Sequence, residues 1–281
     1  MLTNVLLSAV LALTPAQLSA NTPDDITLTS EQAINFLQNH MTADNPDPHH
    51  GQLYSGNRTN LFGSAWKDVD HNKCDTRNDI LSRDLFDTDY SEEPGIQDIT
   101  QGVKKGKSGC RNATVYSGKL NDPYTGKIID FKRGKESGSK VQIDHVIPLG
   151  YAYRHGAWAI AKNGGKNVME QFANDPLNLL AVDGKANNVK KDKGPSEWMP
   201  DNSAFKCEYA LRMTAVLQRY NSFGFTFDDK DKSTLIGLFH GECAGKSFNY
   251  RAPMTGHNTK AEVLSDSVET EDPSLNEAAI K

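Results

Sequence analysis

The sequence predicts an α+β fold, in which short strands and longer helices follow one another without an internal repeat. Apolar, β-branched runs at residues 141–149 and 177–182 indicate two strands, and apolar periodicity at 205–220 and 232–239 indicates two helices. The chain has 281 residues, of which 37% are hydrophobic and 24% charged. This length and composition are typical of a globular protein with one sizeable core or two small ones.

The first 20 residues have the pattern of a signal peptide. An apolar stretch at residues 5–13 is too short to span a bilayer, and small residues follow it, with Ala20 as a cleavage point. No lysine or arginine precedes the stretch, so a buried N-terminal helix is the alternative. We expect a secreted, extracellular protein without a membrane span in the mature chain.

Three regions follow the signal peptide. Residues 21–65 form an N-terminal helix and loop region, because Thr29 and Gln32 have capping-box spacing and residues 42–64 are rich in turn-forming residues. We assign residues 66–250 to the main domain. Residues 251–281 have few large apolar side chains and read as a disordered acidic tail.

Further elements are expected inside the main domain. Thr76 is a suitable N-cap for a helix at 76–85, and the turn-forming residues 121–126 separate two strands of a β-hairpin. The remaining expected elements are strands at 114–120 and 127–133 and helices at 151–161 and 185–191.

The four cysteines are Cys74, Cys110, Cys207 and Cys243, and none of them has CxxC spacing. This spacing argues against a zinc knuckle, and export favours two disulfides. The sequence-local pairing would be Cys74–Cys110 and Cys207–Cys243. Three connectivities are open from the sequence alone.

The charge is distributed unevenly along the chain. The net charge is −5, so the overall charge does not indicate a nucleic-acid-binding protein. Between residues 103 and 140, however, ten basic residues stand against three acidic ones. This segment immediately precedes the first strand of interest, so the local charge suits a polyanion; a solvated basic face is the alternative.

Asp144 and His145 are adjacent near the end of the 141–149 run. A carboxylate is a hard oxygen ligand for a divalent cation, and histidine is suited to removing a proton from water near neutral pH. Neighbouring side chains on a strand point to opposite faces, so these two can share one site only near a strand end or bulge. The pair points to metal-assisted hydrolysis of nucleic acid.

A strand with Asp144 and His145, a second strand with Asn178 and a helix with Asn187 and Lys190 together resemble the HNH, or ββα-metal, nuclease motif. More specifically, the chain resembles the family named after the C-terminal domain of GmrSD-type restriction endonucleases, many members of which are secreted. The resemblance covers roughly residues 70–243. It rests on residues 74–85, 122–127, 141–149, 156–158, 172–182, 186–190 and 194–200.

The resemblance implies a ββα-metal core with surrounding helices and assigns roles to single residues. His145 would be the general base, and Asn178 would tie the loop between the strands so that His145 is aimed correctly. Asp144 and Asn187 would be metal ligands, with Asn188 as the alternative to Asn187. The family motif ends on histidine where this chain has asparagine, which favours Mg²⁺ over Zn²⁺; Mn²⁺ and Ca²⁺ are further alternatives.

The same resemblance implies that Lys190 contacts substrate phosphate. Arg154, His155 and Arg77 are further candidates for phosphate contacts, although a structural ion pair is the better reading of Arg77. Simpler readings remain for two of the catalytic residues: Asp144 as a group that only orients His145, and Asn178 as a turn amide.

The leading hypothesis is a secreted, metal-dependent HNH endonuclease with little sequence preference, acting on DNA, with RNA as the alternative. No base-reading module is evident, so binding would rest on phosphate contacts. One competing hypothesis is a non-catalytic secreted nucleic-acid-binding protein. Another is the same nuclease used as an antibacterial toxin, which would need an immunity or inhibitor protein as partner.

Overall fold

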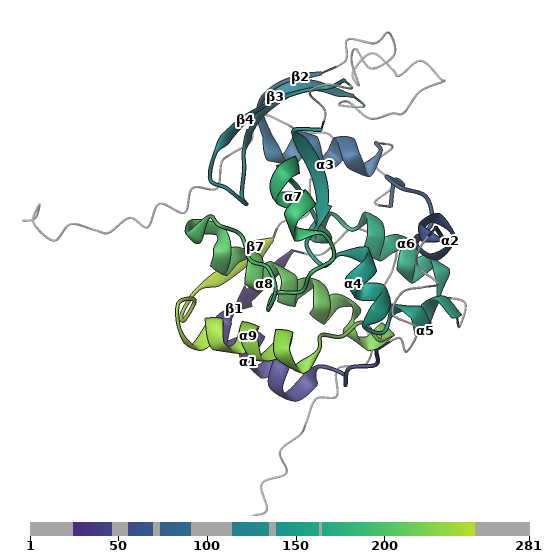
Figure 1. Ribbon diagram of the computed structural model, residues 1–281, viewed down its shortest axis with the longest axis vertical. Coiled ribbons are helices and arrows are strands. Elements are labelled where there is room, and N and C mark those ends of the chain that lie inside the picture. Colours follow the sequence, from purple (N-terminus) through teal and green to yellow (C-terminus); the bar gives the residue numbers. More distant parts are fainter. Residues whose placement is uncertain are drawn as a thin grey trace, which may run out of the picture.

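The part of the chain that the structure describes contains seven strands in three small sheets together with helices (Figure 1). The structure is a computed structural model, and it describes residues 25–46, 56–69, 74–90, 114–134, 139–162 and 165–250. The predicted α+β class is confirmed. The predicted signal peptide and acidic tail lie outside the described residues, and within these no helix is long and apolar enough to cross a membrane.

The central unit is an antiparallel strand pair followed by a helix. Strand β5 (Val141–His145) pairs with β6 (Leu179–Asp183), in a register that places His145 opposite Leu179. Helix α7 (Gly184–Lys190) follows β6 directly and contacts both strands (Figure 1). It starts where it does because the Asp183 side chain accepts a hydrogen bond from the Ala186 N–H at 2.7 Å. The predicted order of strand, insertion, strand and helix is confirmed.

The insertion between β5 and β6 is entirely helical. It consists of α4 (Leu149–Arg154), α5 (Ala157–Lys162), α6 (Lys166–Asn174) and the short 3₁₀ helix η3 (Pro176–Asn178). The single helix predicted at 151–161 is wrong, because the chain breaks at Gly156. Its φ is +104°, and a Cβ there would lie 1.6 Å from the carbonyl oxygen of Gly224. Helix α6 was not predicted.

A second layer covers the other face of β5 and β6. Strands β2 (Leu85–Tyr90), β3 (Val115–Asn121) and β4 (Ile128–Lys132) form an antiparallel sheet in that order, next to helix α3 (Thr76–Asp84). The predicted hairpin is confirmed as β3 and β4, whereas β2 was not predicted. The predicted cap of α3 is off by one residue, because Asp75 and not Thr76 accepts the hydrogen bond from the Asn78 N–H, at 2.9 Å. A small core of Ile80, Leu81, Ile143 and other buried residues fills the interface.

The larger core joins the two ends of the described chain. Strand β1 (Ile26–Thr29) pairs with β7 (Ser247–Tyr250), so the described part of the N-terminal region predicted at 21–65 packs into the main domain. The predicted capping box of Thr29 and Gln32 is present. The helices of this part are α1 (Ser30–Asn35), the π-helical η1 (Phe36–His40), α2 (Arg58–Phe62), α8 (Ser203–Tyr220), the 3₁₀ helix η4 (Asn221–Phe223) and α9 (Asp229–His240).

One of the two predicted disulfides is seen in the described residues. Cys207 in α8 is bonded to Cys243, just after α9, as the sequence-local pairing predicts. The other predicted pairing, Cys74 with Cys110, includes a residue outside the described ranges and stays a prediction.

Candidate functional site

Asn178 fastens the end of β5 to the start of β6. Its side chain is fully buried; Oδ1 accepts a hydrogen bond from the Ile147 N–H at 2.8 Å, and Nδ2 donates to the carbonyls of Ile147 at 3.3 Å and Phe172 at 3.4 Å. The Asn178 carbonyl also accepts from the Val146 N–H at 2.8 Å. The amide therefore fixes the backbone that follows His145, which is the geometry expected of a residue that aims the histidine.

His145 is the last residue of β5, and its side chain points away from α7. The residue is only 9% exposed, and Nε2 lies 2.8 Å from the carbonyl oxygen of Ala173, at the end of α6. A carbonyl oxygen only accepts hydrogen bonds, so Nε2 carries the proton of the neutral ring and Nδ1 keeps its lone pair. Burial lowers the pKa of His145 to about 3, and the positive charges of Arg58 and Lys190 act in the same direction. The ring is therefore neutral near pH 7, with Nδ1 unprotonated.

Asp144 points to the opposite face of β5, toward α7. Its Oδ2 lies 2.9 Å from the Lys190 ammonium and accepts a hydrogen bond from the Tyr124 hydroxyl at 2.5 Å. Lys190 is completely buried and also donates to the backbone carbonyl of His145 at 2.7 Å. Burial raises the pKa of Tyr124 well above its usual value, and the neighbouring Asp144 adds to this, so the phenol stays protonated. Asp144 thus lies in an enclosed ion pair, and the structure does not bring its side chain to the side chain of His145.

Asn187, the second predicted metal ligand, faces β5 but contacts another residue. Its Nδ2 donates to Gln142 Oε1 at 2.8 Å, one pleat away from Asp144 on the same strand face. The described residues contain no group of three or more His, Cys, Asp or Glu side chains that could hold a metal ion. As arranged, the residues do not fit a metal site, because the Lys190 ammonium already provides the cation next to the Asp144 carboxylate.

The predicted phosphate contacts are engaged elsewhere in the protein. Arg154 pairs with Asp192 at 2.5 Å, and His155 lies 3.2 Å from Asp44 Oδ1. Arg77 lies over the Trp66 ring, with its guanidinium carbon 5.8 Å from the ring centroid. The structure does not place these three residues with Asp144 and His145. Lys190 is enclosed, so a contact with phosphate would need its ammonium to leave Asp144.

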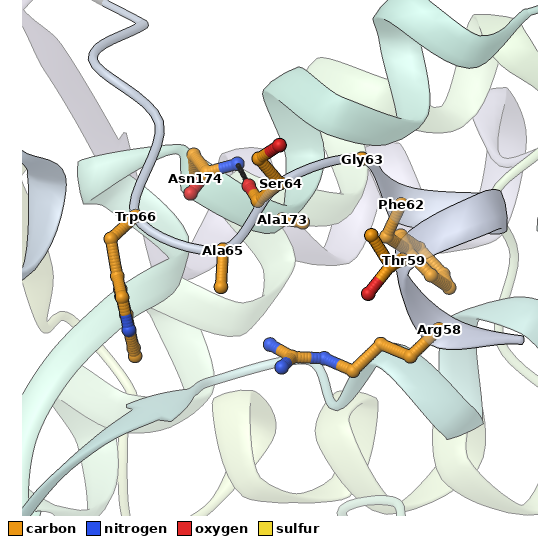
Figure 2. A pocket seen from close by; sticks show the side chains of 9 residues that line it. All are labelled: Arg58, Thr59, Phe62, Gly63, Ser64, Ala65, Trp66, Ala173 and Asn174. Atoms are coloured by element: carbon orange, nitrogen blue, oxygen red, sulfur yellow. Dashed lines mark hydrogen bonds between the residues drawn. The ribbon is translucent and has the colours of Figure 1, made fainter. Parts of the chain in front are cut away.

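Tyr124 and a hollow beside His145 were missed by the sequence analysis. Tyr124 lies in the predicted turn at 121–126, where nothing in the local pattern indicates a partner for Asp144. The hollow lies between α2 and the end of α6, and Figure 2 shows the Arg58 side chain extending across it. It is lined by Arg58, Thr59, Phe62, Gly63, Ser64, Ala65, Trp66, Ala173 and Asn174.

Comparisons with known proteins identify the family of the chain. The chain is similar to an uncharacterized secreted protein of Arthroderma benhamiae, with 29% identity over 171 residues, which cover 59% of this chain and 67% of that protein. No solved structure matches the chain. The family described as GmrSD restriction endonucleases, C-terminal domain, matches residues 75–237, more than half of the chain and the whole of the β5–β6–α7 unit. The chain therefore belongs to the family of GmrSD restriction endonuclease C-terminal domains.

Proposed function

We propose that this protein is a secreted HNH endonuclease that hydrolyses phosphodiester bonds of DNA with little sequence preference, and that His145 activates the attacking water. The observation that carries the proposal is the hydrogen bond from His145 Nε2 to the Ala173 carbonyl at 2.8 Å, which places the proton on Nε2 and leaves the Nδ1 lone pair for a proton from water. Membership of a restriction endonuclease family supports a nuclease reaction, and the secreted relative supports export.

The reaction uses His145 as general base. Nδ1 takes a proton from water as the water oxygen attacks phosphorus; one P–O ester bond then breaks, and the leaving oxygen takes up a proton. The ring keeps its direction during this step, because Ala173 holds Nε2 and Asn178 holds the backbone beyond His145. Holding the base in this position raises the rate of hydrolysis, because a displaced base no longer reaches the water.

Whether the reaction requires the predicted divalent ion, with Mg²⁺ favoured, is tested separately from the role of His145. Such an ion would offset negative charge on the phosphoryl oxygens. Asp144 is available to it only when the Lys190 ammonium moves, so we assign no step to the ion. Cleavage after EDTA treatment, followed by addition of Mg²⁺, Mn²⁺, Ca²⁺ or Zn²⁺ one at a time, tests the requirement. Full activity in EDTA would refute it.

The test of the proposal compares two histidine variants of the secreted protein. His145→Ala should lower plasmid cleavage by about 10² to 10⁴-fold, the usual contribution of a positioned general base. His240→Ala, which alters an exposed histidine at the end of α9, is the matched control and should cleave at the wild-type rate. Thermal unfolding of both variants shows that they are folded.

Parallel reactions with RNA distinguish the two substrate classes. Wild-type cleavage that persists in His145→Ala would refute the assigned base. Binding of nucleic acid without cleavage in any of the four metals would favour the non-catalytic binder instead.

A further inference from the structure

The hollow between α2 and α6 adjoins the proposed base. Ala173 and Asn174 form its wall on the α6 side, and the Ala173 carbonyl is the group that holds His145 Nε2. The opposite wall is α2, whose Phe62 is buried against Phe172 with ring centroids 6.4 Å apart. His145 itself does not line the hollow, and Ala173 is the residue that connects the two.

The loop at residues 63–67, which closes the hollow, is held firmly by α6. Asn174 Nδ2 donates to the Ser64 carbonyl at 3.1 Å, and Asn174 Oδ1 accepts from the Lys67 N–H at 3.0 Å. Glu170 accepts from the Ser64 N–H at 3.3 Å and pairs with the Lys67 ammonium. The hollow is thus a preformed feature of the fold.

Trp66 in this loop has a strained backbone. Its φ is +62°, a left-handed conformation that bulky side chains rarely adopt, and its carbonyl accepts from the Thr76 N–H at 3.3 Å. Strain of this kind is retained where the surrounding contacts over-determine it, and it is frequent at functional sites. One consequence is that the Trp66 ring lies at the edge of the hollow, under Arg77.

Arg58 gives the hollow an uncompensated positive charge. Among the residues that the structure describes, no carboxylate lies within ion-pair distance of its guanidinium, and the side chain is exposed. Figure 2 shows the guanidinium within the hollow, directed toward the side of Trp66. A guanidinium presents a planar fork of donors that matches the oxygens of a phosphate group.

The size of the hollow decides what enters it. The space in the hollow is about 20 Å³, which admits a small group such as one water molecule or one phosphate oxygen. A site of this shape reads the backbone of a nucleic acid and not its sequence.

We propose that the hollow is a subsite for a backbone phosphate of the nucleic-acid substrate next to the attacked one, and that Arg58 is its cation. The inference rests on the proposed nuclease function and extends it. The lining residues between 58 and 66 precede the range matched by the family, whereas Ala173 and Asn174 lie inside it.

The test measures binding in a cleavage-deficient background. A fluorescein-labelled single-stranded DNA 20-mer is titrated with His145→Ala protein, alone or combined with Arg58→Ala, Arg58→Lys or Lys230→Ala, at 25 to 200 mM NaCl. Lys230 is an exposed lysine of α9 and serves as the charge-matched control. Circular dichroism shows that each variant is folded.

Arg58→Ala should weaken binding by about 5 to 20-fold at 25 mM NaCl and lower the slope of log Kd against log salt by about 0.7, the value for one phosphate contact on a single strand. Arg58→Lys should keep the slope, because the charge remains, and recover part of the affinity. Lys230→Ala should change neither.

Two outcomes separate this inference from the proposed function. If Arg58→Ala binds with the affinity and slope of the Lys230→Ala control, the phosphate subsite is wrong, whatever the nuclease does. If His145→Ala cleaves like the wild type, the assigned base fails while the binding comparison still measures Arg58. In the active enzyme, a phosphate subsite further requires that Arg58→Ala raises KM more than it lowers kcat.

Discussion

The enclosed pair of Asp144 and Lys190 makes a strong prediction for stability. Lys190→Met removes the ammonium but leaves the carboxylate, whose side chain is 7% exposed, with the Tyr124 hydroxyl as its hydrogen-bond partner. Asp144→Asn leaves the ammonium buried with the His145 carbonyl. Breaking a buried pair on one side costs about 3–5 kcal/mol, because the remaining charge is desolvated and uncompensated. Each single variant should lose about this much free energy of unfolding.

The double variant decides whether this reasoning holds. Asp144→Asn combined with Lys190→Met removes both charges, so it should lose at least about 2 kcal/mol less than the sum of the single losses. Urea unfolding at pH 7, followed by tryptophan fluorescence, gives the free energies. The partly exposed pair of Lys206 and Glu242 is the control, and Lys206→Met should cost less than about 1 kcal/mol. Additive losses, or a Lys190→Met cost equal to that of the control, would refute the coupling.

Three further outcomes are expected. Asn178→Ala should lose about 2–4 kcal/mol of stability and most of the cleavage rate, because Ile147 loses both of its hydrogen bonds to the side chain; urea unfolding and plasmid cleavage measure the two effects. The pKa of His145 is about 3 in the folded protein and about 6.5 in the unfolded chain. The unfolded chain therefore binds a proton at this residue before the folded protein does, so the protein keeps its full stability above pH 6.5 and loses stability as the pH falls toward 3. The loss reaches about 2 kcal/mol at pH 5, and the urea midpoints of His145→Gln should lack this part of the pH dependence. Replacing Cys207 and Cys243 by alanine should cost up to about 4 kcal/mol, the chain-entropy value for a separation of 36 residues, seen as a lower Tm.

The elements that were predicted correctly depend on local signals. The strands β5 and β6 are runs of β-branched and apolar residues, α7 follows a turn at Asp183, and the capping box before α1 is a four-residue pattern. In each case the residues that decide the structure are close together in the sequence. The role expected of Asn178 was implied by the family resemblance and stays a prediction; the structure shows that its amide contacts the end of β5.

The features that were missed depend on contacts between distant segments. Helix α4 ends where it does because Gly156 packs against Gly224, and neither residue indicates this in its own surroundings. The partner of Asp144 is Tyr124 from the β3–β4 turn, and Arg58 reaches the surroundings of His145 from a segment outside the family range. Strand alternation allowed Asp144 and His145 to share one site only near a strand end or bulge, and we expected such an end here. The structure instead gives the two side chains separate partners, Tyr124 for Asp144 and the Ala173 carbonyl for His145.

Three separate contacts hold His145, and their arrangement bears on the question of the metal. The Ala173 carbonyl accepts a hydrogen bond from the His145 ring, and the Asn178 side chain binds the backbone that follows His145. The Lys190 ammonium donates to the His145 carbonyl and also pairs with Asp144. A divalent ion that binds Asp144 must compete with an ammonium 2.9 Å away, so it binds at the expense of the Lys190 contact. If Asp144 is a metal ligand, Lys190→Met should bind Mg²⁺ at least 10-fold more tightly than the wild type in a calorimetric titration, a change of about 1.4 kcal/mol. Asp144→Asn in the same background should abolish this binding, and equal affinities in wild type and Lys190→Met would place the ion away from Asp144.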